Sequence, residues 1–220
     1  MLGSLLSALL LLLLIAQPSA RIFAQTTGQA AKPLTLSQVW TLDGAYSKNG
    51  VSFRYPTTWQ TGTRFAQQPP ALTQSEDAKP VAGFSYSEGG FPRSRVVGPY
   101  SKTNLEGFGF VYSVVPATDA TECEAKAAGV SGASRRTGIA IGGRPFSLYP
   151  TEDAGMSQSL TGNLYATYAA PKCYLFETDV AVVSPGVVDG VQPLTPGQLD
   201  AISARLLGMM QSVRIGPEPH

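Results

Sequence analysis

The stretch that decides the fold is NGVSFRYP, residues 49–56. Asn49-Gly50 is a dipeptide typical of tight turns between strands. The five residues that follow, Val51–Tyr55, alternate apolar and polar side chains, as a strand with one face in the core does. Pro56 has no backbone N–H to donate to a neighbouring strand, so we expect the strand to end at Tyr55. A turn and a half-buried strand near the start of the ordered chain, which we place near Trp40, indicate a fold built on β-sheet.

Further along, several segments alternate in the same way or are apolar throughout. The segment Phe108–Val115 is apolar on both faces and is therefore expected at the centre of a sheet. The last four candidates follow one another with short links, which predicts an antiparallel meander with a tight turn at Gly142-Gly143. Residues 61–80 and 87–106 are expected to be surface connections. The strand candidates are Val81–Tyr86, Phe108–Val115, Thr137–Ile141, Arg144–Tyr149, Asn163–Tyr168 and Cys173–Val183.

Two helices have recognisable ends. Asp119 stands three residues before Glu122, an arrangement that caps the first free amides of a helix, and Glu122 can pair with Lys126 one turn later. Gly129 is expected to end this helix of about ten residues. The second helix starts at residues 195–198, Thr-Pro-Gly-Gln, which combine an N-cap, a proline at the first helical position and a capping-box glutamine. An apolar stripe along this helix predicts that it packs on a face of the sheet. The stripe consists of Leu199, Ile202, Leu206, Met209 and Val213.

Both ends of this ordered region resemble one known group of proteins. Tyr46, the motif at residues 49–56 and Trp59 resemble the opening strand of the PsbP/Mog1-like superfamily, whose domains often show a Tyr, a Gly-x-Ser-Phe-x-Tyr-Pro strand and a nearby Trp. The helix Pro196–Gln211 and residues 212–215 resemble the closing helix of that group and its apolar-basic ending.

The resemblance implies an α+β fold in which helices pack on the faces of an antiparallel β-sheet, an α/β/α sandwich. Phe53, Tyr55 and Trp59 should then be mostly buried. It also implies action through binding, as in an extrinsic photosystem II subunit and a partner of a nuclear-transport GTPase. It carries over no catalytic, cofactor-binding or metal-binding residue, and a fold by itself is a weak guide to activity.

The first 24 residues are interpreted as a secretory signal peptide. Residues 5–15 form an almost unbroken leucine run that is shorter than the roughly 20 apolar residues of a membrane span. We expect cleavage between Ala24 and Gln25. Because no Lys or Arg precedes the leucine run, an uncleaved membrane anchor stays open as the alternative. The expected organisation is a signal peptide over residues 1–24, a flexible lead-in over 25–39, a single domain over 40–215 and a mobile tail over 216–220, in a secreted or periplasmic protein.

Cys123 and Cys173 are the two cysteines of the chain. In an exported protein, one disulfide between them is the simplest interpretation, with two buried free thiols as the alternative. Such a bond would pin the first helix onto the meander. Two thiolates without a histidine make a poor metal site.

Composition excludes several classes of function. The chain has 16 Lys and Arg against 15 Asp and Glu, so it lacks the positive charge with which proteins follow a phosphate backbone, and nucleic-acid binding is disfavoured. Its 23 Gly and 17 Pro, with only 14% charged residues, suit a loop-rich fold with substantial sheet.

The residues offer little catalytic chemistry. The single histidine is His220, in the expected mobile tail, which disfavours Ser-His-Asp and Cys-His catalysis and most zinc sites. The sequence contains no GxSxG, CxxC, GxxxxGK or GxGxxG motif, and no cofactor is implied.

A pair of carboxylates, Glu177 and Asp179, is the remaining weak candidate. Both project from one face of a strand about 6.6 Å apart, which permits acid–base work or a calcium contact. The interpretation we favour is that both acids face water, while the core is faced by Tyr174, Phe176, Val180 and Val182. The acidic pair at residues 152–153 and the basic pair Arg135-Arg136 are interpreted in the same way, as solvated side chains.

The sequence is therefore interpreted as an exported, non-enzymatic, monomeric domain that binds a protein or a cell-envelope component, with membrane contact only if the leader is retained. One alternative is a secreted hydrolase that uses carboxylates or a divalent ion. The other is a small-ligand carrier with an aromatic groove. The carrier is disfavoured because the aromatic residues of the strand candidates are expected in the core and not in a groove. They are Phe84, Tyr86, Phe108, Phe110, Tyr112, Tyr165, Tyr168, Tyr174 and Phe176.

Overall fold

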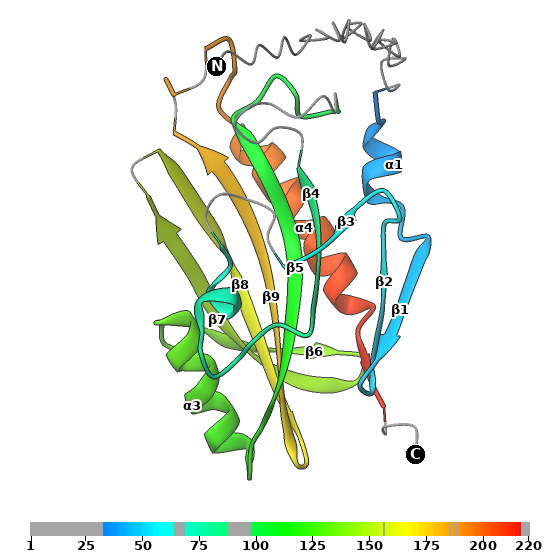
Figure 1. Ribbon diagram of the computed structural model, residues 1–220, viewed down its shortest axis with the longest axis vertical. Coiled ribbons are helices and arrows are strands. Elements are labelled where there is room, and N and C mark those ends of the chain that lie inside the picture. Colours follow the sequence, from blue (N-terminus) through cyan, green and yellow to red (C-terminus); the bar gives the residue numbers. More distant parts are fainter. Residues whose placement is uncertain are drawn as a thin grey trace, which may run out of the picture. The chain divides into compact units, whose positions relative to one another are not determined.

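A seven-stranded antiparallel sheet forms the centre of the computed structural model, in the order β3-β4-β5-β9-β8-β7-β6 (Figure 1). The chain is described for residues 33–63, 69–87, 98–155, 157–184, 186–187 and 189–216. The expected leader, its cleavage site and His220 lie outside these residues. The strands of this sheet are β3 (Gln60–Thr61), β4 (Ala82–Ser87), β5 (Leu105–Pro116), β6 (Thr137–Ile141), β7 (Arg144–Ala154), β8 (Gln158–Ala169) and β9 (Lys172–Val183).

The expected meander is confirmed, since β6, β7, β8 and β9 pair in sequence order, each antiparallel to the next. Strand β7 runs beyond Tyr149, where we expected it to end, and continues through Pro150 to Ala154. Strand β6 pairs with β7 only as far as Leu148. Pro150 therefore has no neighbour in β6, and its missing N–H removes no hydrogen bond on that side of the strand. Pro150 still pairs with Asn163 of β8 on the other side.

A smaller sheet contains the motif at residues 49–56. It consists of β1 (Gly44–Lys48), β2 (Val51–Tyr55) and β10 (Arg214–Ile215), with β2 in the middle. Strand β2 has the predicted bounds, and the turn before it uses positive φ angles at Asn49 (54°) and Gly50 (74°). Phe53 and Trp59 are buried, whereas Tyr55 is half-buried, with its ring 4.4 Å from that of Phe84.

Helix α4 (Pro196–Gln211) lies with this small sheet on one face of the large one. Its predicted start is confirmed, because Thr195 and Gln198 form the reciprocal capping box. Four residues of its stripe are buried and Leu199 is half-buried. The core on this side joins the stripe to aromatic residues of the sheet, among them Phe53, Phe84, Phe108, Phe110, Tyr112 and Phe176.

Helix α3 (Ala120–Ser131) covers the opposite face. Asp119 caps it as expected, and Glu122 pairs with Lys126 at 3.1 Å. The helix ends at Gly132, whose φ is 66°, and not at the expected Gly129. A residue with φ in this left-handed range ends a helix without a Cβ penalty only when it is glycine. With helices on both faces of an antiparallel sheet, the expected α+β class and layer order are confirmed.

Two short helices correct the expected connections. Helix α1 (Leu36–Trp40) begins inside the segment expected to be a flexible lead-in, and Thr35 and Gln38 form a capping box at its start. Val39 is buried, and Trp40 stacks on Phe108 with ring centroids 4.4 Å apart. These contacts order residues that carry little apolar pattern of their own.

Helix α2 (Ala71–Gln74) lies within residues 61–80, which we expected to be a surface connection. Its Leu72 is completely buried against the α3 face of the sheet. Among the described residues, no helix is long and apolar enough to span a bilayer.

Candidate functional site

Glu177 and Asp179 lie on β9, and the structure places both side chains in the interior. Neither residue exposes any surface to solvent. The expectation that they face water is therefore wrong, although they do share one sheet face and Phe176 and Val180 do face the other core. The reason is that β9 lies between β5 and β8, with the α4 layer on one face and α2 and α3 on the other.

The Glu177 carboxylate caps the start of α2. Its Oε1 accepts the backbone N–H of Ala71 and its Oε2 accepts that of Leu72, both at 2.8 Å. These amides are at the start of a helix, where no intrahelical carbonyl is available to them. One carboxylate thus satisfies two buried donors, and its own two oxygens are both occupied.

The Asp179 carboxyl lies beside Glu177 and has one other partner. Thr151 of β7 donates its hydroxyl to Asp179 Oδ1 at 2.9 Å. Burial raises the pKa of Asp179 well above its usual range, and the charge of Glu177 and the hydrogen bond between the two carboxyls raise it further. Burial also raises the pKa of Glu177, but the amides of Leu72 and Ala71 and the bond from Asp179 oppose that rise.

These effects favour the neutral form at Asp179 over the neutral form at Glu177. Asp179 Oδ2 is buried and has no hydrogen-bond partner among the described residues. The pair then carries one negative charge, and the α2 amides neutralise part of it.

Gly162 of β8 makes room for the pair. It stands opposite Asp179 in the sheet, and a Cβ at this position would collide with Asp179 Oδ1 and with the carbonyl oxygen of Thr178. The two carboxyl groups are therefore covered by α2 and, on the β8 side, by the backbone of Gly162. It fits poorly as a metal site, because the described residues contain no group of three or more potential ligands.

The two cysteines form one disulfide in the structure. Cys123 on α3 and Cys173 on β9 have Cα atoms 5.2 Å apart, and both residues are buried. The bond attaches α3 to the central strand of the sheet.

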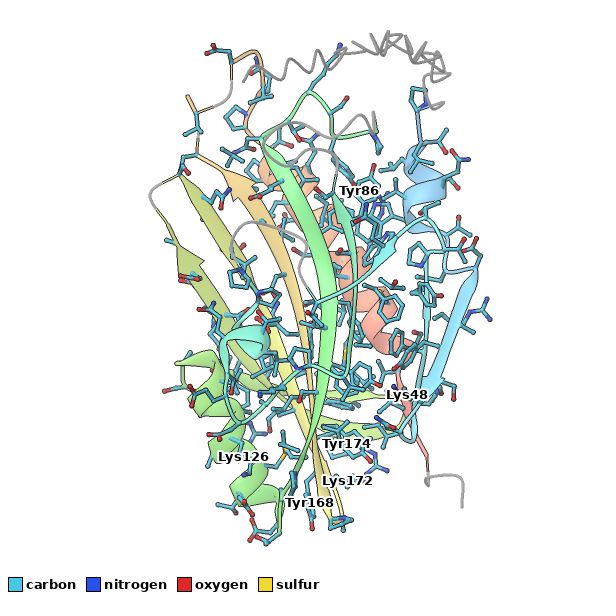
Figure 2. The ribbon with its side chains drawn as sticks, in the orientation of Figure 1. Lys48, Tyr86, Lys126, Tyr168, Lys172 and Tyr174 are labelled. Carbon is cyan, nitrogen blue, oxygen red and sulfur yellow. A yellow bond between two sulfur atoms is a disulfide. The ribbon has the colours of Figure 1, made fainter. Side chains whose placement is uncertain are left out.

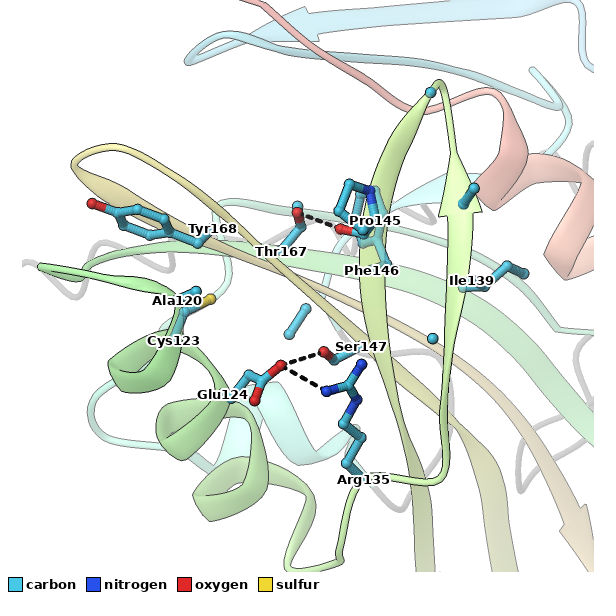
Figure 3. A pocket seen from close by; sticks show the side chains of 14 residues that line it. Ala120, Cys123, Glu124, Arg135, Ile139, Pro145, Phe146, Ser147, Thr167 and Tyr168 are labelled. Carbon is cyan, nitrogen blue, oxygen red and sulfur yellow. Dashed lines mark hydrogen bonds and ion pairs between the residues drawn. The ribbon is translucent and has the colours of Figure 1, made fainter.

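An open groove lies next to this bond, between α3 and strands β6–β8 (Figure 3). We call it the α3 groove; its volume is about 530 Å³. Small residues of the strands form much of its lining, namely Gly138, Ala140 and Ala166. Tyr168 lines the groove as well. The other strand aromatics that we expected in the core are buried there.

Polar contacts cross the α3 groove at one point. Glu124 Oε1 on α3 accepts the Ser147 hydroxyl at 2.8 Å and pairs with Arg135 Nη1 at 3.1 Å (Figure 3). Arg135, which we expected to be simply solvated, therefore links α3 to the start of β6. The charge of Glu124 is largely compensated within the groove.

Strand β6 forms the rim of the groove. It is an edge of the seven-stranded sheet, with β7 as its one neighbour among the described strands. Its sequence, TGIAI, has no charged residue and no proline, and four of its five residues are at least partly exposed. The groove could not be predicted from the sequence, because the residues that α3, β6 and β8 contribute to it follow no pattern of their own.

No family model matches the chain, and no curated protein matches it. Among solved structures, it is similar to LpqN of Mycobacterium tuberculosis, described as involved in cell envelope biogenesis, with 8% identity, 84% of this chain and 90% of that chain covered, and a TM-score of 0.40. It is also similar to the Saccharomyces cerevisiae Ran-binding protein Mog1p, with 9% identity, 76% and 90% coverage, and a TM-score of 0.36. Both TM-scores are below 0.5, so the structural likeness is a loose one.

Proposed function

We propose that this chain is an exported, non-enzymatic domain that binds a protein partner at the β6 edge and the adjoining α3 groove. The observation that carries the proposal is the unprotected edge strand itself. Natural sheet edges are usually blunted by charged residues, proline or a covering segment, because an open edge pairs with other chains. Strand β6 has neither a charge nor a proline.

The register of the β6–β7 hairpin leaves backbone groups available for a partner. Ile141 pairs with Arg144 across the turn at Gly142-Gly143, whose φ angles are 58° and 79°. In such a hairpin the pair next to the turn is hydrogen-bonded and alternate pairs follow, so Gly138 and Ala140 direct their N–H and C=O groups away from β7. An extended segment of a partner can add there as a further strand.

The α3 groove would receive the side chains of that added strand. Gly138 and Ala140 share the α3 side of the sheet with Ser147 and leave space above them. Since Arg135 and Ser147 already engage Glu124, a segment with uncharged side chains fits the groove best.

Export is the second part of the proposal. We propose that residues 1–24 are removed and that the domain acts in a secreted or periplasmic setting, which the disulfide supports, since such bonds persist in oxidising compartments. N-terminal sequencing of the protein from its native host tests this. A first residue at or near Gln25 is expected, and an intact Met1 or Leu2 would favour an anchored protein.

The two alternative functions find less support. A hydrolase that used Glu177 and Asp179 would need substrate to reach two carboxyl groups that have no exposed surface. A carrier with an aromatic groove would need the aromatic side chains at a cavity, yet the strand aromatics pack mainly into the core beneath α4.

Photo-crosslinking tests the binding site. Benzoylphenylalanine would replace Ala140, which is exposed on β6, and in a control Asp200, which is exposed on α4. We expect a discrete crosslinked partner from the native host with the probe at 140 and none with the probe at 200. Adding the variant Gly138→Lys should abolish the crosslink, because a lysine on an edge strand opposes pairing. An identical crosslink with both probes, or one that survives Gly138→Lys, would contradict the proposal.

A further inference from the structure

Two adjoining pockets lie where the β6–β7 turn, the β8–β9 turn and β10 meet. The first, of about 280 Å³, is lined by Arg144 and Arg214, and the second, of about 370 Å³, by Arg144 and Lys172. Arg144 and Ile215 line both, so we treat them as one site, the basic pocket. Figure 2 shows Lys172 and Tyr174, which both line the second pocket, close together at this end of the sheet.

The Arg214 guanidinium is held in place by backbone. Its Nη1 donates to the carbonyl oxygens of Gln211 at 2.9 Å and Val213 at 2.8 Å. The side chain also lies over Gly142, where a Cβ would be 3.2 Å from Nη1. Both bonds use Nη1. The Nε and Nη2 groups therefore remain as donors on a guanidinium whose position is already fixed.

Arg144 contributes a second guanidinium. It is half-buried, and no hydrogen bond or ion pair joins its side chain to the described residues. Lys172 also lines the second pocket. No Asp or Glu is among the described residues that line either pocket, and the two described salt bridges lie elsewhere, at Glu122–Lys126 and Glu124–Arg135.

We propose that the basic pocket binds a phosphate group. Guanidinium groups match the oxygens of phosphate with paired N–H donors, and two guanidinium groups with no Asp or Glu among the described lining residues favour an anion with several acceptor oxygens. Apolar side chains of Ile141, Val213 and Ile215 also line the pocket, so the phosphate could be carried on an ester. Both a soluble phosphate compound and the headgroup of an anionic lipid present this chemistry.

This site is independent of the proposed binding at β6. The two pockets share Gly143, Pro145 and Phe146, but the two arginines line only the basic pocket and Gly138 lines only the α3 groove. The variant Gly138→Lys should therefore leave phosphate binding unchanged, and loss of one activity would not imply loss of the other.

The test uses the full chain purified from an exporting host. Titration with inorganic phosphate at low ionic strength is followed by calorimetry, and co-sedimentation is measured with phosphatidylcholine vesicles with and without phosphatidylglycerol. Arg144→Gln should weaken binding about tenfold or more, since it removes a guanidinium that makes no structural bond. The matched control Arg136→Gln removes an exposed arginine at the other end of β6 and should change little.

Arg214→Lys separates charge from geometry. It keeps the positive charge but loses the planar pair of donors, so binding should also fall, while the unfolding transition reports any loss of fold. Binding of inorganic phosphate would identify a soluble ligand, and binding only of the phosphatidylglycerol vesicles would identify a lipid headgroup. Absence of both, or equal effects of Arg144→Gln and Arg136→Gln, would overturn the proposal.

Discussion

Glu177 Oε2 accepts the backbone N–H of Leu72 at 2.8 Å and so joins the central strand β9 to α2 across 105 positions of sequence. Because its Oε1 accepts the neighbouring amide of Ala71, a single carboxylate holds the first turn of a four-residue helix. A helix this short is not stable by itself. The contact explains how a polar segment comes to cover the sheet face and to exclude water from Asp179.

Glu177→Gln should destabilise the protein by about 1–3 kcal/mol, because an amide offers one acceptor oxygen to two buried N–H groups and places an NH₂ against one of them. Urea unfolding at neutral pH measures the loss. Glu76→Gln is the matched control, since Glu76 is an exposed acid in the same segment. Equal stability of the two variants would argue against the capping role of Glu177.

The protonation of Asp179 predicts a pH dependence. Burial raises its pKa above the value in the unfolded chain, so folding takes up a proton. The stability that this proton contributes is therefore greatest at acidic pH and declines as pH rises above the unfolded pKa towards the folded one. Asp179→Asn keeps the size of the side chain and removes the titrating proton. The gain of Asp179→Asn over the wild type should therefore grow from pH 5 to pH 8.

Urea unfolding at several pH values checks this prediction. At pH 8 we expect the Asn variant to be as stable as the wild type or more stable, by up to roughly 3 kcal/mol. Asp200→Asn, at an exposed position of α4, should show no such trend. If the stability of Asp179→Asn relative to the wild type fell as pH rose, Asp179 would be ionised in the folded protein.

Elements with local signals could be predicted from the sequence. Strand β2 has the expected bounds because an Asn-Gly turn precedes it and a proline follows it. Helix α4 has the expected bounds because its cap residues are adjacent in sequence. The capping box of Thr35 and Gln38 was an equally local signal, and it would have identified α1.

The environment of the carboxylates could not be predicted in this way. Alternation along β9 indicates that Glu177 and Asp179 share a face, but the same pattern is compatible with water or with a covering segment. The covering segment is α2, which comes from a polar region about 105 positions earlier. Only the tertiary contact decides that the acids are buried, and the α3 groove is likewise assembled from separate elements.

Cys173→Ser should lower stability by roughly 2–5 kcal/mol, the usual cost of removing a disulfide from a small exported domain. The bond attaches α3 to β9, and both cysteines are buried, so the variant also places a hydroxyl in the core. After denaturation, Cys123 of the variant should react with a thiol reagent. Two reactive thiols in unreduced wild-type protein would refute the bond.

Gly162→Ala should destabilise the protein through overpacking. A Cβ at this position would meet Asp179 Oδ1 and the Thr178 carbonyl oxygen, both of which belong to the central strand and cannot move far without breaking sheet pairs. Overpacking of this kind costs about 1–3 kcal/mol. The matched control is Gly208→Ala on α4, where a Cβ has no neighbour within 4 Å and alanine should stabilise the helix by about 0.5–1 kcal/mol. Thermal and urea unfolding of both variants should therefore shift in opposite directions, and a neutral Gly162→Ala would mean that the carboxyl pair is less tightly enclosed than its burial indicates.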